Sequence, residues 1–194
     1  MFKLIQSLQI MLLMTLLSAI IGCSSDVPNK SFFQLTSNLA NHGSAMTQST
    51  HYFIWIESIE VADFLNKSGI VLQTDDIKYT TATNHLWVSA LSQQLADRLS
   101  QDLTQIMPNY LVSTNSITTP SLTVKLFIDG FHGNYNGDAI ITGRWVMTDK
   151  SGKIVTKVIK RQIPLTTNGY NALVKALSQG WQDEEQDFAN SIKH

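Results

Sequence analysis

The first 22 residues have the pattern of a cleavable secretory signal, which takes them out of the part of the chain that folds. Lys3 gives a positive start, residues 4–21 are mainly apolar, and Gly22 places a small residue before the expected cleavage point. The remaining chain then begins at Cys23, the only cysteine in the sequence. A single cysteine cannot form an intramolecular disulfide bond, so the folded body must be held together by its own core.

A membrane-spanning helix is the alternative interpretation of this N-terminal run. Gln6, Ser7 and Gln9 interrupt it, and it falls short of the about 20 predominantly apolar residues that a spanning helix needs. We therefore predict that residues 1–22 form a signal peptide.

The residues around the cleavage point resemble the lipobox of bacterial lipoproteins. Residues 20–24 read Ile-Ile-Gly-Cys-Ser, with an isoleucine where Ala or Ser is more usual in the middle of the box. The resemblance implies that Cys23 receives a diacylglyceryl thioether and becomes an acylated N-terminus. Several acyl chains together anchor a protein stably. Asp in place of Ser24 would favour retention at the inner membrane, so Ser24 implies the outer membrane, on its periplasmic face.

Cleavage would leave 172 residues and remove Lys3 from the 14 basic residues, so 13 basic residues would face 15 acidic ones, a net charge of −2. We expect a lipidated tether over residues 23–30 and one domain over residues 31–194, because this length suits a single core. A near-neutral charge argues against nucleic acid binding, which requires a basic face.

The periodicity of apolar residues predicts an α+β domain. Leucines at steps of three and four predict a helix from Ser89, as its N-cap, to Met107, and a second helix runs from Asn168 or Asn171 to Lys193. Both would pack on one face of a mixed, mostly antiparallel sheet, giving two layers. Strands are predicted from short β-rich or alternating segments, at residues 31–35, 52–61, 70–72, 77–81, 122–135, 138–147 and 153–165.

Asn136-Gly137 predicts a tight two-residue hairpin turn. Tyr135 would then face Asp138, and the register would place Ile128 opposite Trp145 and Gly130 opposite Gly143 on the core face. The other face would carry Asp129 opposite Arg144, flanked by three aromatic residues. Two interpretations of this face remain open. It could form a second apolar layer covered by the N-terminal segment or a loop, or it could be an exposed patch that binds a second copy or a partner. We take as candidate interface residues Phe127, Phe131, Tyr135, Asp129 and Arg144.

The sequence contains no pattern typical of a catalytic, metal or cofactor site. The histidines lack ligand spacing, and no nucleophile elbow, phosphate-binding loop or dinucleotide fingerprint occurs. The acidic pairs Asp75-Asp76 and Glu184-Glu185 are interpreted as solvated charge. We therefore predict a protein that is not an enzyme, with no cofactor and no metal.

The chain resembles the PqiC-type auxiliary lipoproteins of ABC transport systems, which are periplasmic partners of MCE-domain lipid-transport machines. The resemblance covers almost all of the chain after the tether and rests on the order and spacing of its pieces. These pieces are Phe33-Gln34-Leu35, Gly69-Ile70-Val71 with Gln73, Asp76-Ile77-Lys78-Tyr79, Asn84 with Leu86-Trp87, Leu91, Gln93-Gln94-Leu95, Phe131, Gly133, Tyr135-Asn136-Gly137, Gly143, Trp145, Gly169-Tyr170 and Trp181.

The resemblance implies a non-enzymatic role at the outer membrane that supports membrane integrity. Such proteins self-associate into a ring and receive the end of an MCE-domain tunnel protein of the PqiB type. A lipoprotein chaperone for another envelope protein remains the alternative. An envelope hydrolase would need a polar pocket with convergent groups, for which the candidates are Asp75, Asp76, His85 and His132.

Overall fold

The computed structural model describes residues 29–39, 50 and 52–192, so the predicted signal peptide and Cys23 lie outside the described residues. In this part of the chain the elements are the strands β1 (Ser31–Phe33), β2 (Tyr52–Val61), β3 (Gly69–Gln73) and β4 (Tyr79–Trp87), the helix α2 (Leu91–Ile106), the strands β5 (Tyr110–Ser113), β6 (Leu122–Gly133), β7 (Asp138–Asp149) and β8 (Ile154–Pro164), and the helix α3 (Tyr170–Ile192).

The strands form one mixed sheet, as predicted. Its order is β1-β4-β3-β6-β2-β5, and β7 joins β6 to β8 on the other side of β6. The two longest ladders, β6–β7 and β7–β8, are antiparallel, whereas β1–β4, β2–β5, β2–β6 and β3–β6 are parallel. The β2 and β3 strands both lie beside β6, β2 along its first half and β3 at its end.

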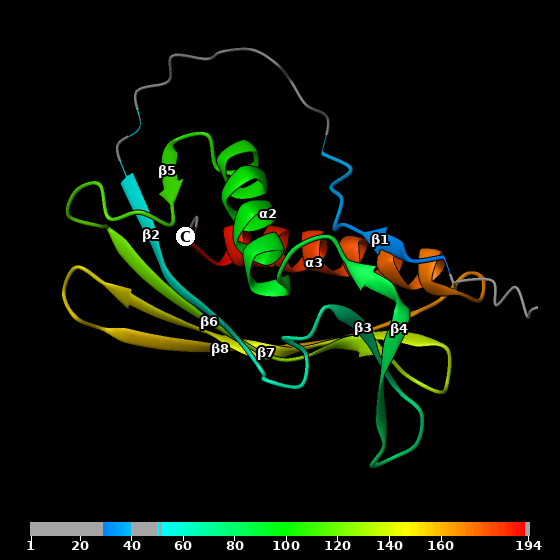
Figure 1. Ribbon diagram of the computed structural model, residues 1–194. Coiled ribbons are helices and arrows are strands. Elements are labelled where there is room, and N and C mark those ends of the chain that lie inside the picture. The colour runs from blue at the N-terminus through cyan, green and yellow to red at the C-terminus, as the bar shows by residue number, and fades with distance from the viewer. Residues whose placement is uncertain (1–28, 40–49, 51, 193–194) are drawn as a thin grey trace, which may run out of the picture.

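Both helices lie on one side of the sheet, so the domain has the predicted two layers (Figure 1). The core fills the space between the layers, and its largest fully buried side chains include Trp145, Trp181, Phe131 and Phe188. Among the described residues, no helix lies on the opposite side of β6, β7 and β8 (Figure 1). Neither helix in the described part of the chain is long and apolar enough to cross a membrane.

Helix α2 buries the predicted leucine stripe, but it begins differently from the prediction. Leu95, Leu99 and Leu103 are fully buried, as their spacing on one helical face requires. The N-cap is Ala90, without a side-chain cap, so the predicted capping role of Ser89 is wrong. The Gln94 side chain instead donates to the Ser89 carbonyl oxygen at 3.0 Å.

The register predicted for the β6–β7 hairpin is wrong, and its turn explains why. Gly133 pairs with Ala139, and the turn spans residues 134–137, ending at Gly137 with a φ of 83°. The Asn134 side chain accepts hydrogen bonds from the backbone N–H groups of Asn136 and Asp138, at 3.0 and 2.8 Å. A type I turn followed by a left-handed glycine makes a longer loop than the expected two-residue turn.

A β-bulge at Asp129 shifts the register again. The pairing moves from Ile128 with Gly143 to Gly130 with Thr142, which leaves Asp129 as the additional residue. A bulge inserts one residue into one strand and so reverses the side-chain alternation beyond it. Phe127 and Phe131 therefore point to opposite faces of the sheet, although their spacing predicted one face.

Candidate interaction surface

The side of the sheet opposite α2 and α3 presents cross-strand rows of side chains. Paired residues of neighbouring strands share a face, and the pairing aligns Glu60, Phe127, Arg144 and Val158 across β2, β6, β7 and β8. We call this row and the adjoining Lys125, Val146 and Asp129 the open face. It combines apolar side chains with charges of both signs.

Arg144 is the centre of the open face. Its guanidinium group lies 4.2 Å from the centre of the Phe127 ring, a distance suited to a cation–π interaction. It also forms an ion pair with Asp129, with 3.5 Å between Nη1 and Oδ2. Since Arg144 pairs with Phe127 in the ladder, the two residues of this ion pair do not lie directly opposite each other, which corrects the predicted register. Both side chains remain largely exposed, so this pair contributes about 0–1 kcal/mol to stability.

Phe131 is not on this surface. It is 1% exposed and contacts Trp87 and Trp181, with ring centres 6.3 and 6.5 Å apart. The bulge at Asp129 turns the side chain toward the helices, where it fills the core between β6 and α3. The expectation that Phe131 shares a face with Phe127 is therefore wrong.

Tyr135 is exposed, but it belongs to a different part of the surface. It lies in the turn beyond the end of β6, and its hydroxyl donates a hydrogen bond to Asp76 in the β3–β4 hairpin. This hydrogen bond to a carboxylate raises the pKa of the Tyr135 hydroxyl. Of the five residues proposed from the sequence, Phe127, Asp129 and Arg144 are thus brought together, and Tyr135 and Phe131 are not.

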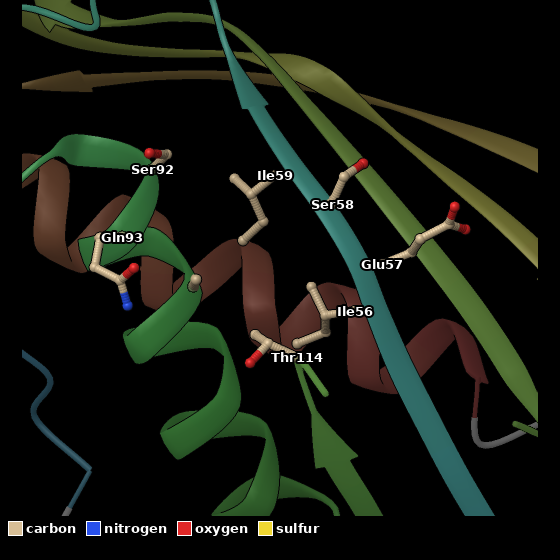
Figure 2. A pocket seen from close by; sticks show the side chains of 8 residues that line it. Ile56, Glu57, Ser58, Ile59, Ser92, Gln93 and Thr114 are labelled. Atoms are coloured by element: carbon tan, nitrogen blue, oxygen red, sulfur yellow. The ribbon is translucent and has the colours of Figure 1, made fainter. Parts of the chain in front are cut away.

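A shallow pocket lies between β2 and α2 (Figure 2). Its volume is about 250 Å³. Ile56 and Ile59 point toward the helices, whereas Glu57 and Ser58 point to the other side of β2 (Figure 2). Glu57 forms an ion pair with Lys125 at 3.0 Å. No acid, base and nucleophile converge among the residues that line this pocket, which are Ile56, Glu57, Ser58, Ile59, Ser92, Gln93, Ala96 and Thr114.

The residues considered for an envelope hydrolase take part in packing contacts or face solvent. His85 stacks on Tyr170 with ring centres 3.9 Å apart, and His132 meets the edge of Tyr79 at 5.2 Å. Burial lowers the pKa of His132, so its neutral form is favoured. Asp75 and Asp76 are exposed, as predicted. Among the described residues, no group of three or more His, Cys, Asp or Glu side chains is arranged to hold a metal ion.

Glu184 and Glu185 are buried, which corrects the prediction that this pair is solvated. Helix α3 packs against the sheet and also against α2, so two adjacent positions of the helix can both be covered. The Glu184 carboxylate accepts from Trp145 Nε1 and from Arg161 Nε, each at 2.8 Å. This side chain therefore joins β7, β8 and α3 through one buried carboxylate.

Glu185 lies in a second buried cluster, between the two helices. The residue is 0% exposed, and Asp102 of α2 is also buried and forms an ion pair with Arg98. Neither carboxyl oxygen of Glu185, nor the Trp181 ring N–H, has a hydrogen-bond partner of good geometry. Burial and then the charge of Asp102 raise the pKa of Glu185 well above its ordinary value of 4.5. The folded protein therefore holds a proton on Glu185 at pH values where the unfolded chain has lost it.

This proton makes part of the stability depend on pH. At Glu185 the folded state binds more protons than the unfolded state above pH 4.5, so the contribution of this residue to the free energy of unfolding falls as pH rises from there toward the raised pKa. Glu185→Gln, which cannot ionise, should remove this component. We expect the variant to gain stability relative to the parent between about pH 5 and about pH 8, measured by urea unfolding at both values. An identical pH dependence in the two proteins would contradict a raised pKa at Glu185.

Sequence reasoning did not identify Glu60 and Val158 as parts of the open face. Lys125 shares this face with Phe127 as alternation predicts, since i and i+2 lie on one face of a strand. Glu60 and Val158 come from strands β2 and β8, and no local pattern indicates that these strands lie on either side of the β6–β7 hairpin.

The family model and the curated relatives found by comparison are all described as transport lipoproteins. A family model described as "ABC-type transport auxiliary lipoprotein component" matches residues 33–189. The chain is 32% identical over 172 residues to "Intermembrane transport lipoprotein PqiC" of Escherichia coli (strain K12), over 89% of this chain and 91% of that protein. The protein of the same name from Shigella flexneri matches to the same extent.

Two solved structures share the fold. The crystal structure of an uncharacterized protein, 30% identical in sequence, superposes with a TM-score of 0.74 and covers 84% of this chain and 99% of its own. A crystal structure of a protein from Xanthomonas campestris gives a TM-score of 0.65 at 11% identity, covering 81% of this chain and 92% of its own. At that identity the second similarity concerns the fold alone.

Proposed function

Because the chain belongs to the family of ABC-type transport auxiliary lipoproteins, we propose that it is an outer-membrane-anchored subunit of a trans-envelope MCE/ABC-type lipid transport system. In this role the acylated Cys23 holds the domain on the periplasmic face of the outer membrane. Copies of the domain form a ring, and the ring docks the periplasmic end of an MCE-domain tunnel protein of the PqiB type. This attachment supports membrane integrity.

The observation that carries the proposal is the extent of the family match. It spans residues 33–189, which include all elements of the fold from the end of β1 to the last turns of α3. The similarity therefore concerns the whole domain and not one isolated motif. A scaffold of this kind requires an anchor, a rigid core and surfaces for neighbours, and it requires no convergent catalytic groups.

The open face supports the assembly part of the proposal. Val158 on the edge strand β8 is 73% exposed, and it lies in one row with Phe127 and Arg144. Aromatic and arginine side chains with exposed apolar neighbours are the composition typical of protein–protein interfaces. We therefore assign the subunit or partner contact to the open face.

Val158→Asp should disrupt this contact without unfolding the monomer. A surface substitution on an edge strand changes stability by about 1 kcal/mol or less, whereas a charge buried in an interface is strongly unfavourable. We expect at least about a tenfold loss of crosslinked assembly or partner recovery, measured by crosslinking in native membranes, copurification and light scattering.

Val155→Asp is the matched control. Val155 lies on the same edge strand and is also exposed, but it pairs with Met147 and so faces the helix side. Its substitution should leave the assembly intact. Normal assembly of Val158→Asp would exclude the open face as the contact. Recovery of a β-barrel protein in place of an MCE-domain protein would favour the alternative role as a chaperone.

A further inference from the structure

An apolar patch lies beside the point at which the tether enters the fold. Phe32 of β1 is 63% exposed and Val88, just after β4, is 54% exposed. Phe32 pairs with the half-buried Leu86, so these two side chains share a face of the β1–β4 ladder. Val88 follows Leu86 by two residues, and its backbone N–H donates to the Phe33 carbonyl oxygen at 2.9 Å. We call Phe32, Leu86 and Val88 the entry patch.

The entry patch faces away from the core. Phe33, the next residue of β1, lies on the opposite face, where its ring is 6.4 Å from that of Tyr170 in α3. Trp87, its partner in β4, is buried. Since side chains alternate along a strand, Phe32 is directed to the side of the ladder opposite α3.

The segment that follows β1 is attached firmly to both helices. The Leu35 N–H donates to the buried Gln94 side chain at 2.9 Å, and the Thr36 N–H donates to the Ser178 hydroxyl at 3.1 Å. The Asn38 N–H donates to the Gln182 side chain at 3.0 Å. These contacts fix the direction in which the chain enters the domain, so the position of β1 relative to the body does not depend on the tether.

The tether is short compared with the domain that it holds. Seven residues separate Cys23 from Ser31, and a fully extended chain of this length reaches about 27 Å. The 12 residues of β7 alone span about 40 Å. A bilayer that holds the acyl chains of Cys23 must therefore lie within about 27 Å of Ser31, and the entry patch contains Phe32, the exposed apolar side chain nearest to the tether in the chain.

We propose that the entry patch contacts the phospholipid surface, with Phe32 and Val88 inserted at the level of the headgroups. This inference rests on the proposed anchoring through Cys23. Exposed apolar side chains such as Phe insert at the boundary between headgroups and acyl chains, and the exposed Lys30 suits anionic headgroups. Together the anchor and the patch would hold the domain in one orientation on the membrane, as docking of a partner from the periplasm requires.

Site-specific labelling tests the proposal on the full processed lipoprotein. Because Cys23 is the only cysteine, Phe32→Cys or Val155→Cys would introduce the single free thiol for a fluorescent dye. Val155 of β8 is 45% exposed, faces away from the open face, and pairs with Met147 near the end of β7 that is farther from the Asn134–Gly137 turn, so it provides a matched control. In vesicles of phosphatidylethanolamine and phosphatidylglycerol, brominated acyl chains should quench the dye at position 32 at least about threefold more than the dye at position 155.

The possible outcomes separate the inference from the function on which it rests. Equal quenching at the two positions, with Cys23 acylated by mass spectrometry, would overturn the membrane contact and leave the anchored role intact. Protection of the position 32 dye from iodide before vesicles are added would also overturn it, because the patch would then be covered by a second copy of the chain. A parent chain that itself reacts with the dye would have a free Cys23, which would overturn both proposals.

Discussion

Gly143→Ala should lower the free energy of unfolding by at least about 4 kcal/mol, the size seen for severe backbone clashes. A Cβ atom at this position would lie 2.1 Å from the Phe127 carbonyl oxygen. That oxygen belongs to the backbone of β6 just before the bulge, so it cannot move without breaking the β6–β7 ladder. For a chain of this size the melting temperature should fall by about 10 °C or more, measured by circular dichroism.

Gly180→Ala is the control for Gly143→Ala, because the atoms that crowd position 180 belong to side chains and not to the backbone. A Cβ atom there would also be crowded, at 2.6 Å from Ile163 Cδ1 and 3.0 Å from Ile141 Cδ1. These atoms are the ends of flexible side chains, and alanine is better than glycine in a helix by about 1 kcal/mol. The two effects should nearly cancel. If Gly143→Ala is no more harmful than Gly180→Ala, the close approach of β6 and β7 at the bulge is not present in solution.

Glu184→Ala should destabilise the fold by about 3 kcal/mol, because it leaves the buried Trp145 ring N–H and the partly buried Arg161 Nε–H without their acceptor. Trp145 Nε1 and Arg161 Nε both donate to the Glu184 carboxylate at 2.8 Å. Trp145 is fully buried, and the side chain of Arg161 is 21% exposed. Neither donor can therefore be fully solvated once the carboxylate is removed. Urea unfolding at neutral pH measures the loss directly.

Asp187→Ala provides the matched control for this network. Asp187 binds the same guanidinium group, through Nη2 at 2.5 Å, but its side chain is 59% exposed. An ion pair in contact with water contributes about 0–1 kcal/mol, so this variant should remain close to the parent in stability. Equal losses for Asp187→Ala and Glu184→Ala would show that burial of Glu184 does not determine the strength of the interaction.

The sequence predicted the positions of helices and strands better than it predicted how the strands pair and which side chains reach the surface. The leucine stripe of α2 and the bounds of β2 follow from local periodicity, which depends only on residues in the same element. The strand β5, Tyr110–Ser113, was not predicted. The candidate surface was predicted in part: Phe127, Asp129 and Arg144 lie together, whereas Phe131 faces the core and Tyr135 contacts the β3–β4 hairpin.

Periodicity and composition thus determined that α2 and α3 are amphipathic helices packed against a sheet, because each helix must bury its apolar stripe. Only the tertiary structure decided which side chains reach the surface. The bulge at Asp129 reverses the alternation of β6 and turns Phe131 inward, and a bulge depends on the pairing partner as well as on the strand itself. Similarly, Glu184 and Glu185 are buried because α3 has the sheet on one side and α2 on the other, a placement that no local pattern in the helix could indicate.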